Sequence, residues 1–518
     1  MNESVDPKIL MIGLEAFEPA LVEQWTESGD LPNIKMLIEQ GSYCRLDTTG
    51  LLTASVWGVF NIGKRPENTG LYYNFQWDPG RMRIQRQDWG TSKYPYFWTR
   101  LSQLGKRTIV IDPDLAGLQP QANSIQIIGW QGHESWRRPG SWPPELMRET
   151  IRRFGREHLG LEHAIQGQPR KQQAVWKSLL SSVRRRVHLL LHFLRDENWD
   201  LLVANFPEGH RAGHQLWGFP ENRGTVSQET ADEPGTALKE VYKAIDTAIG
   251  ELLAFVPPNT YILGYSPYGM GPQRGSRHLL GALLERLDGS LQGESNPGPK
   301  RRARAVPSYH HALQQTISRN SPVAAAAARM LPQSIKVAIR HHLSVGGIDW
   351  RHARFFSLPT DGSGYIRFNL RGREARGIVH PGDELEKLKS EIEDELMGWV
   401  DLRTGAPIVA KVWRTAELFP GPHLADLPDL LAEWGEPLAT DLSRAPRAGV
   451  IRGKDPEHRA GEHSSGGLLI AKGPGIPGGA RPPRASLLDV PPTVFRILGL
   501  PPLESLEGKA IASITARV

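Results

Sequence analysis

The stretch that decides the fold is LLTASVW at residues 51–57, which continues through GKRP at 63–66 to GLYYN at 70–74. A polar run ends just before it, and apolar residues then follow at roughly helical spacing from Val56. Thr53 stands where that helix could begin, so we expect Thr53 to cap it. A helix N-terminus offers backbone N–H groups and a positive dipole end, which favour an anion such as phosphate or sulfate. Thr53 is therefore either an ordinary helix cap or part of an anion site.

The composition excludes several classes of protein. The 518-residue chain is long enough for one large core with a substantial insertion, or for two domains. The chain contains no run of about 18 apolar residues that could span a bilayer. A single cysteine, Cys44, rules out internal disulfides and fits a reducing compartment. Residues 1–8 are polar and acidic and lack the pattern of a signal peptide, so we expect a cytoplasmic protein.

The net charge is +6, with basic clusters at residues 184–186 and 300–304. No aromatic-basic repeat or nucleic-acid motif accompanies these clusters, so we interpret them as solvated surface. The charge balance is compatible with an anionic small-molecule substrate. No feature of the sequence indicates an oligomeric state.

Helix and strand patterns alternate along the chain. The apolar run Lys8–Leu14 predicts a buried parallel strand that delivers Glu15 to its carboxyl end, where open α/β sheets place their ligands. Further strands are expected near residues 43–48, 107–112, 199–206, 260–265, 365–370, 408–413 and 468–471. Helices are expected near residues 19–28, 31–40, 94–104, 179–195, 238–255, 383–399 and 492–498. This alternation predicts an α/β fold with a mainly parallel sheet flanked by helices.

The character of the sequence changes between residues 283 and 347. Gly, Pro and Arg are frequent there, and an alanine-rich segment, Val323–Met330, favours a helix. We expect an inserted helical or flexible cap at 283–347, with the α/β core formed by residues 1–282 and 348–518.

Two histidines follow the strand expected at residues 199–206. His210 and His214 are four residues apart, so both imidazoles would lie on one face of a helix and could hold one metal ion. The alternative is a pair of surface histidines without a ligand.

Several segments together resemble one known family. In chain order they are the first strand with Glu15, the Thr53 segment with Gly63-Lys64 and Asn74, and residues 208–217, 266–272, 366–373, 461–463 and 489–493. In their order and spacing, from Ile9 to about Ile511, they resemble the alkaline phosphatase superfamily, specifically its type I phosphodiesterase/nucleotide pyrophosphatase branch. The resemblance implies an alkaline-phosphatase-like α/β core.

The resemblance also implies a mechanism. In that family a threonine nucleophile attacks phosphorus, two zinc ions clamp the phosphoryl oxygens, and an asparagine donates to the developing charge. By position, Thr53 would be the nucleophile and Asn74 the donor. One metal site would correspond to His210, His214 and His463, and the other to Glu15, Thr53, Pro267 and Tyr268.

The sequence departs from the family pattern at both metal sites. Proline has no ligand atom and a neutral tyrosine is a poor zinc ligand, so the site with Pro267 and Tyr268 is expected to have lost its metal. His210 stands where the family has an aspartate, which leaves three neutral imidazoles able to hold a single Zn²⁺ with an open position. We expect one zinc ion or none. Glu15 and Tyr268 then become candidates to assist Thr53, as proton acceptor and donor respectively.

Three interpretations of function follow. The first is a divergent enzyme that acts on a phosphate or sulfate ester, or a related anion, through Thr53 and at most one divalent metal. The second is a non-hydrolytic group-transfer enzyme on the same fold, and the third is a catalytically inactive member that binds an anion or a protein. The first requires that the three imidazoles meet beside the Thr53 hydroxyl at the carboxyl edge of one sheet.

Overall fold

The computed structural model describes residues 6–48, 52, 55–90, 92–131, 139–156, 168–218, 235–292, 335, 345, 347–436, 438–455, 459–501 and 503–515. The chain divides into two compact units. The first comprises Met1–Arg65, Asp88–Pro272 and Ala460–Val518, and the second comprises Pro66–Gln87 and Gln273–Arg459. Among the described helices, none is both long and apolar enough to cross a bilayer.

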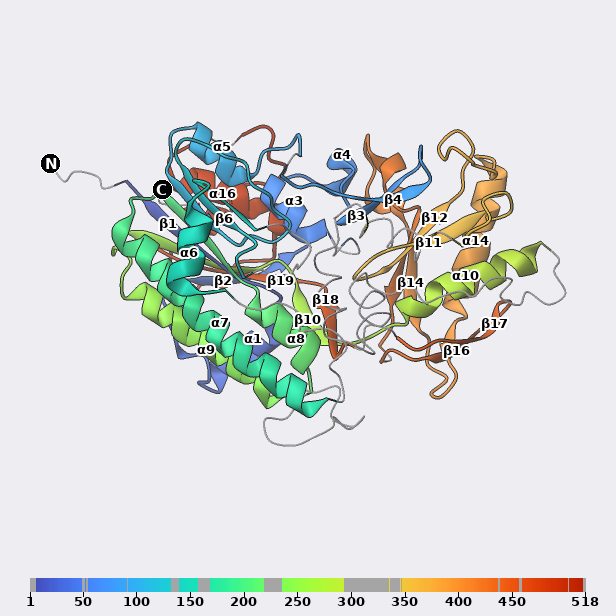
Figure 1. Cartoon of the computed structure of the whole chain (residues 1–518), viewed down its shortest axis with the longest axis horizontal. Coiled ribbons are helices and arrows are strands. Elements are labelled where there is room, and N and C mark those ends of the chain that lie inside the picture. The colour runs from blue at the N-terminus through green and yellow to red at the C-terminus, as the bar shows by residue number, and fades with distance from the viewer. Residues whose placement is uncertain are drawn as a thin grey trace. The chain divides into compact units, whose positions relative to one another are not determined.

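A nine-stranded sheet forms the centre of the first unit (Figure 1). Its strands are β1 (Lys8–Leu14), β2 (Ser42–Asp47), β5 (Thr108–Ile111), β6 (Ser124–Ile128), β7 (Gly140–Trp142), β8 (Leu201–Phe206), β9 (Thr260–Ser266), β19 (Gly467–Lys472) and β20 (Ala485–Ser486). Their order is β20-β2-β19-β9-β1-β8-β5-β6-β7. Strands β9, β1, β8, β5 and β6 are mutually parallel, whereas β19 and β7 pair antiparallel at the two sides of this group. The predicted α/β fold with a mainly parallel sheet is confirmed.

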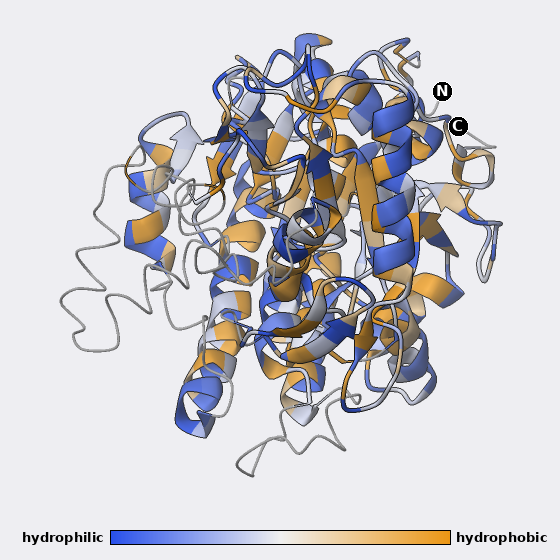
Figure 2. Ribbon diagram, turned by 90° about the vertical axis from the view of Figure 1, so that its right-hand side faces the viewer, coloured by the Kyte–Doolittle hydropathy of each residue, from blue (hydrophilic) through white to orange (hydrophobic). Residues whose placement is uncertain are grey.

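Helices cover both faces of this sheet. On one face, α7 (Pro169–Asp196), α8 (Glu208–Leu216) and α9 (Thr236–Leu253) contact one another, with α1 (Pro19–Glu27), α2 (Pro32–Glu39) and α6 (Leu146–Phe154) beside them. The other face carries α3 (Val56–Ile62), α5 (Phe97–Gln103), η4 (Leu487–Asp489), α16 (Val490–Ile497) and α17 (Ala512–Thr515). In Figure 2 the helices carry hydrophilic and hydrophobic residues together, as expected for helices with one side on a sheet and the other in water.

The second unit is built mainly from antiparallel strands. Its four-stranded sheet has the order β11 (Phe355–Leu358), β12 (Gly364–Phe368), β15 (Leu430–Trp434), β14 (Val409–Arg414), and its three-stranded sheet has the order β13 (Val400–Asp401), β16 (Leu442–Ala445), β17 (Gly449–Arg452). A hairpin joins β3 (Phe75–Asp78) to β4 (Arg83–Arg86). The helical elements are α4 (Pro66–Thr69), α10 (Arg277–Leu291), α14 (Asp383–Met397), α15 (Thr415–Leu418) and η3 (Leu424–Asp426). Apolar residues of α10, α14 and both sheets share one core.

Two expectations concern the Thr53 cap of α3 and the insertion at 283–347. Helix α3 begins at Val56 with Ser55 at its N-cap position, so the prediction that Thr53 caps this helix is wrong. Thr53 itself lies outside the described residues. Most of the cap expected at 283–347, including its alanine-rich segment, also lies outside them, and α10 runs across the expected start of the cap.

A buried charge network anchors α8, the helix that carries two of the candidate histidines. The Arg186 guanidinium on α7 is fully buried and lies 3.1 Å from Asp112 Oδ2 and 3.2 Å from Glu208 Oε1, the latter in the first turn of α8. Burial alone would lower the pKa of Arg186, but the charges of Glu208 and Asp112 raise it above its ordinary value. Removing the guanidinium would leave two buried carboxylates uncompensated.

We therefore expect Arg186→Met to lower the free energy of unfolding by about 3–5 kcal/mol, because a broken buried ion pair costs about that much. The measurement is urea denaturation followed by circular dichroism. Arg184→Met is the matched control, since Arg184 lies exposed on the same helix and such a change shifts stability by about 0.5 kcal/mol or less. Equal losses in the two variants would contradict an anchoring role for the buried network.

Candidate metal centre

The candidate site lies at the carboxyl edge of the parallel strands in the first unit. Strands β1 and β8 end in register, Leu14 beside Phe206, so Glu15 and the start of α8 leave the sheet at the same level. Strand β9 ends beside them and leads to Tyr268. Because β19 runs antiparallel to β9, it begins at this edge, and the residues before it arrive there too. Four distant segments of the chain therefore converge at one place.

Helix α8 presents two imidazoles from adjacent turns. His210 and His214 are buried, and the centroids of their rings lie 4.6 Å apart. The segment between them is helical, so the expected shared face is present.

A two-stranded ribbon brings the third imidazole. Strand β10 (Gly269–Pro272) pairs antiparallel with β18 (Gly461–Ser464), and His463 lies opposite Met270. The ribbon packs tightly on α8, since a Cβ atom on Gly461 would lie 2.3 Å from the backbone oxygen of Gly213. Glycine at position 461 thus permits the close approach that places His463 against α8.

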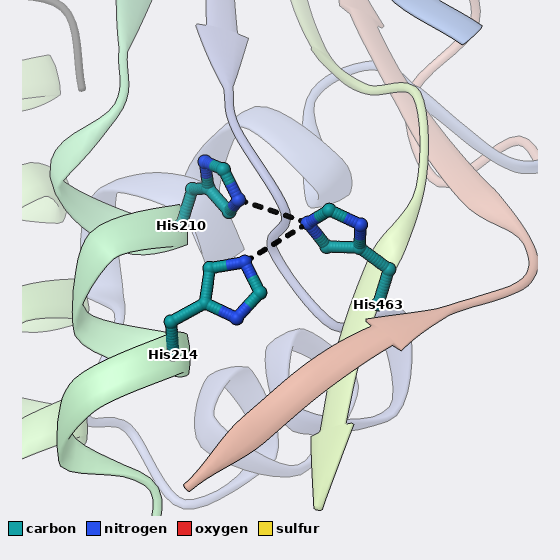
Figure 3. A group of neighbouring side chains, drawn as sticks. All are labelled: His210, His214 and His463. Atoms are coloured by element: carbon teal, nitrogen blue, oxygen red, sulfur yellow. Dashed lines mark hydrogen bonds between the residues drawn. The ribbon is translucent and has the colours of Figure 1, made fainter. Parts of the chain in front are cut away.

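The three imidazoles surround a common point (Figure 3). The ring centroid of His463 lies 4.9 Å from that of His210 and 4.8 Å from that of His214. With the 4.6 Å between His210 and His214, the three centroids form a nearly equilateral triangle. His463 Nε2 lies 2.8 Å from His210 Nε2 and 3.2 Å from His214 Nε2. Zn–N bonds of about 2.0–2.1 Å at tetrahedral angles would separate two ligand nitrogens by about 3.3 Å. With candidate ligand atoms of all three residues within 4.8 Å of one another, the cluster is compatible with a single divalent cation.

The hydrogen bond of His214 supports the same conclusion. His214 Nδ1 lies 2.8 Å from the carbonyl oxygen of Gly461, and a carbonyl oxygen can only accept. Nδ1 therefore carries a proton, and the neutral form of this ring would present its lone pair at Nε2, toward the other two imidazoles. A lone pair directed at the centre of the cluster is what a metal ligand requires.

Acidic and phenolic groups border the cluster. Glu15 Oε1 lies 2.8 Å from His210 Nδ1, and the ring centroids of Tyr268 and His463 lie 4.6 Å apart. Glu18 ties the loop after β1 to the ribbon, since its carboxylate accepts hydrogen bonds from Ser464 Oγ at 2.6 Å and from the N–H of Met270 at 3.1 Å. Burial raises the pKa of Glu18 above its ordinary value. Burial, and then the charge of Glu15, raise the pKa of Tyr265 far above its usual range, so that phenol stays neutral.

The structure brings together five of the predicted site residues: Glu15, His210, His214, Tyr268 and His463. Asn74 belongs to the second unit, where it is buried and its carbonyl oxygen accepts from the N–H of Gln87 at 2.8 Å. The roles assigned to these residues and to Thr53 stay predictions. Sequence analysis missed Asn205, which contacts Glu15; its place near the end of a parallel strand was the available signal.

A family model described as type I phosphodiesterase/nucleotide pyrophosphatase matches residues 9–345. The chain belongs to this family. Its fold is shared with an inactive form of murine ectonucleotide pyrophosphatase/phosphodiesterase 5 in complex with AMP, at 10% identity and a TM-score of 0.51, over 96% of each chain. Phosphonoacetate hydrolase from Sinorhizobium meliloti 1021, in complex with phosphonoacetate, shares it at 11% identity and a TM-score of 0.51, over 95% of each chain.

The family and these structures place the fold in the alkaline phosphatase superfamily, which confirms the resemblance. A comparison with curated proteins finds no match. The family and its structural neighbours are hydrolases. Members of the family generally bind divalent metal ions. At 10% and 11% identity the solved structures show the fold alone.

We predict that the protein, stripped with a chelator and reloaded with excess zinc, retains one zinc ion per chain after desalting. His214→Ala should retain markedly less, because it removes one of three ligands. The measurement is metal content by mass spectrometry. His192→Ala is the control, since this histidine lies on α7 against Asp196. Two tightly held ions per chain would contradict the loss of the second site.

Proposed function

We propose that this chain is an enzyme that acts on a phosphate or sulfate ester, or a related anion, through Thr53 and a single divalent metal ion. His210, His214 and His463 would hold the ion, which we expect to be Zn²⁺. The observation that carries the proposal is the convergence of three imidazoles, all largely buried, at the carboxyl edge of the sheet. Three neutral nitrogen ligands suit a catalytic zinc with one open position.

The ion, when bound, would supply positive charge beside the anionic group of the substrate. Thr53 is the proposed nucleophile: its Oγ forms a bond to phosphorus or sulfur as the bond to the ester oxygen breaks. Glu15 is the candidate acceptor of the Thr53 proton, and the Tyr268 phenol is the candidate donor to the departing oxygen. Asn74 is the candidate donor to charge on the transferred group. Water then releases the product from Thr53.

Two further features support an anionic substrate. The relatives solved with AMP and with phosphonoacetate each hold a small anion. The chain itself has a formal net charge of +6, which favours the approach of anions. At Pro267 and Tyr268 the chain has no strong zinc ligand, so the proposal includes one ion rather than two.

The proposal is tested by turnover of the zinc-loaded protein on aryl phosphate monoesters, aryl phosphodiesters and aryl sulfates. We expect hydrolysis of at least one of these classes, and Thr53→Ala should lower kcat/KM by at least about 10³-fold, as loss of a nucleophile does. Thr53→Ser keeps a hydroxyl and should retain measurable activity. Thr48→Ala is the control, because this threonine follows β2 on the same connection.

Each other outcome has a clear meaning. Unchanged activity in Thr53→Ala would remove the nucleophile role. Consumption of ester without release to water, but with transfer to an added alcohol, would indicate a group-transfer enzyme. Metal binding with no turnover of any of the three ester classes would contradict the enzyme proposal and favour a binding role.

A further inference from the structure

One contact of the cluster is not explained by metal binding alone. The two nitrogens of His210 contact different partners: Nε2 lies 2.8 Å from His463 Nε2, and Nδ1 lies 2.8 Å from Glu15 Oε1. Glu15 and His210 are almost completely buried, at 0% and 4% exposure. Glu15 therefore contacts the side of the imidazole that does not face the metal position.

A second residue holds the carboxylate itself. The side-chain amide of Asn205, at 1% exposure, donates a hydrogen bond to the other oxygen, Glu15 Oε2. Asn205 lies on β8 directly beside Gly13 on β1. A Cβ atom at position 13 would lie 2.5 Å from Asn205 Oδ1, so the glycine leaves the space that this amide occupies.

We propose that Glu15 and Asn205 form an outer-shell pair that orients His210 for metal binding. The carboxylate favours the tautomer of His210 with the proton on Nδ1, which leaves the lone pair on Nε2, toward the other two imidazoles. Asn205 holds the carboxylate in place. Glu15 thus positions His210, in addition to its proposed role as acceptor of the Thr53 proton, and is not itself a ligand of a second metal.

The surroundings of His214 are similar. Its Nδ1 is 2.8 Å from the carbonyl oxygen of Gly461, while its Nε2 faces His463. Both histidines of α8 therefore have Nδ1 against an oxygen atom and Nε2 toward the cluster centre. The backbone supplies that oxygen for His214, and a buried carboxylate supplies it for His210. A carboxylate also lowers the net charge of the loaded site, which a neutral carbonyl does not.

This inference rests on the proposed metal-binding function, and its test needs no turnover. The experiment measures the zinc dissociation constant of the full chain by competition with a chromophoric chelator, and the visible absorption of the Co²⁺-loaded protein. Glu15→Gln should raise the zinc dissociation constant by about 10–100-fold, the usual effect of losing an outer-shell partner. It should also change the Co²⁺ spectrum, because the geometry of one ligand is altered.

Asn205→Ala should shift zinc affinity in the same direction by a smaller factor. The double variant should bind zinc no more weakly than Glu15→Gln alone, because Asn205 acts through Glu15. Glu23→Gln is the matched control: this carboxylate contacts Tyr43 and Arg45 and should leave affinity and spectrum unchanged. Circular dichroism of each metal-free variant checks the fold, and Asn205→Ala carries the test if Glu15→Gln does not fold.

The outcomes separate the two proposals. A wild-type chain that binds no zinc would overturn the single-metal function and, with it, the outer-shell role. Tight binding by the wild type, with unchanged affinity and Co²⁺ spectrum in Glu15→Gln and Asn205→Ala, would overturn the outer-shell role alone. Additive losses in the double variant would overturn the claim that Asn205 acts through Glu15.

Discussion

Parallel pairing of β1 with β8 and β9 is the constraint on which the candidate site depends. Parallel strands end at the same edge of a sheet, so the residues that follow them are brought together whatever their distance in the chain. Glu15, the start of α8 and Tyr268 meet for this reason. Strand β19 runs antiparallel to β9, so its first residue lies at the same edge. The preceding strand β18 carries His463 and therefore lies there too.

Buried polar and charged side chains, each with a hydrogen-bond or ion-pair partner, hold the elements around the cluster in place. Arg186 pairs with Asp112 and with Glu208 in the first turn of α8, so the helix that carries His210 and His214 begins on a fully buried ion pair. Glu18 links the loop after β1 to the ribbon that carries His463. Buried charges of this kind cost free energy unless they are paired, which gives each element a single favourable position.

The local pattern of the sequence was enough to predict much of the fold. The apolar runs Lys8–Leu14 and Trp199–Phe206 indicated strands, and helical spacing indicated α9 and α14 close to their observed bounds. These predictions succeeded because hydrophobic periodicity is a property of neighbouring residues. The helix after residue 53 was less well predicted: its start at Val56 depends on the local backbone path, which a threonine at a plausible position does not determine.

The sequence by itself determined the family, the alternation of helix and strand, and the four-residue spacing of His210 and His214 on one helix face. Only the tertiary structure decided that His463 joins them at 2.8 Å and 3.2 Å, and that Glu15 lies against the outer nitrogen of His210. The physical reason is the separation along the chain of the residues that must meet. Spacing within a helix follows from local geometry, whereas a meeting of residues some 250 positions apart follows from strand order and register across a whole sheet.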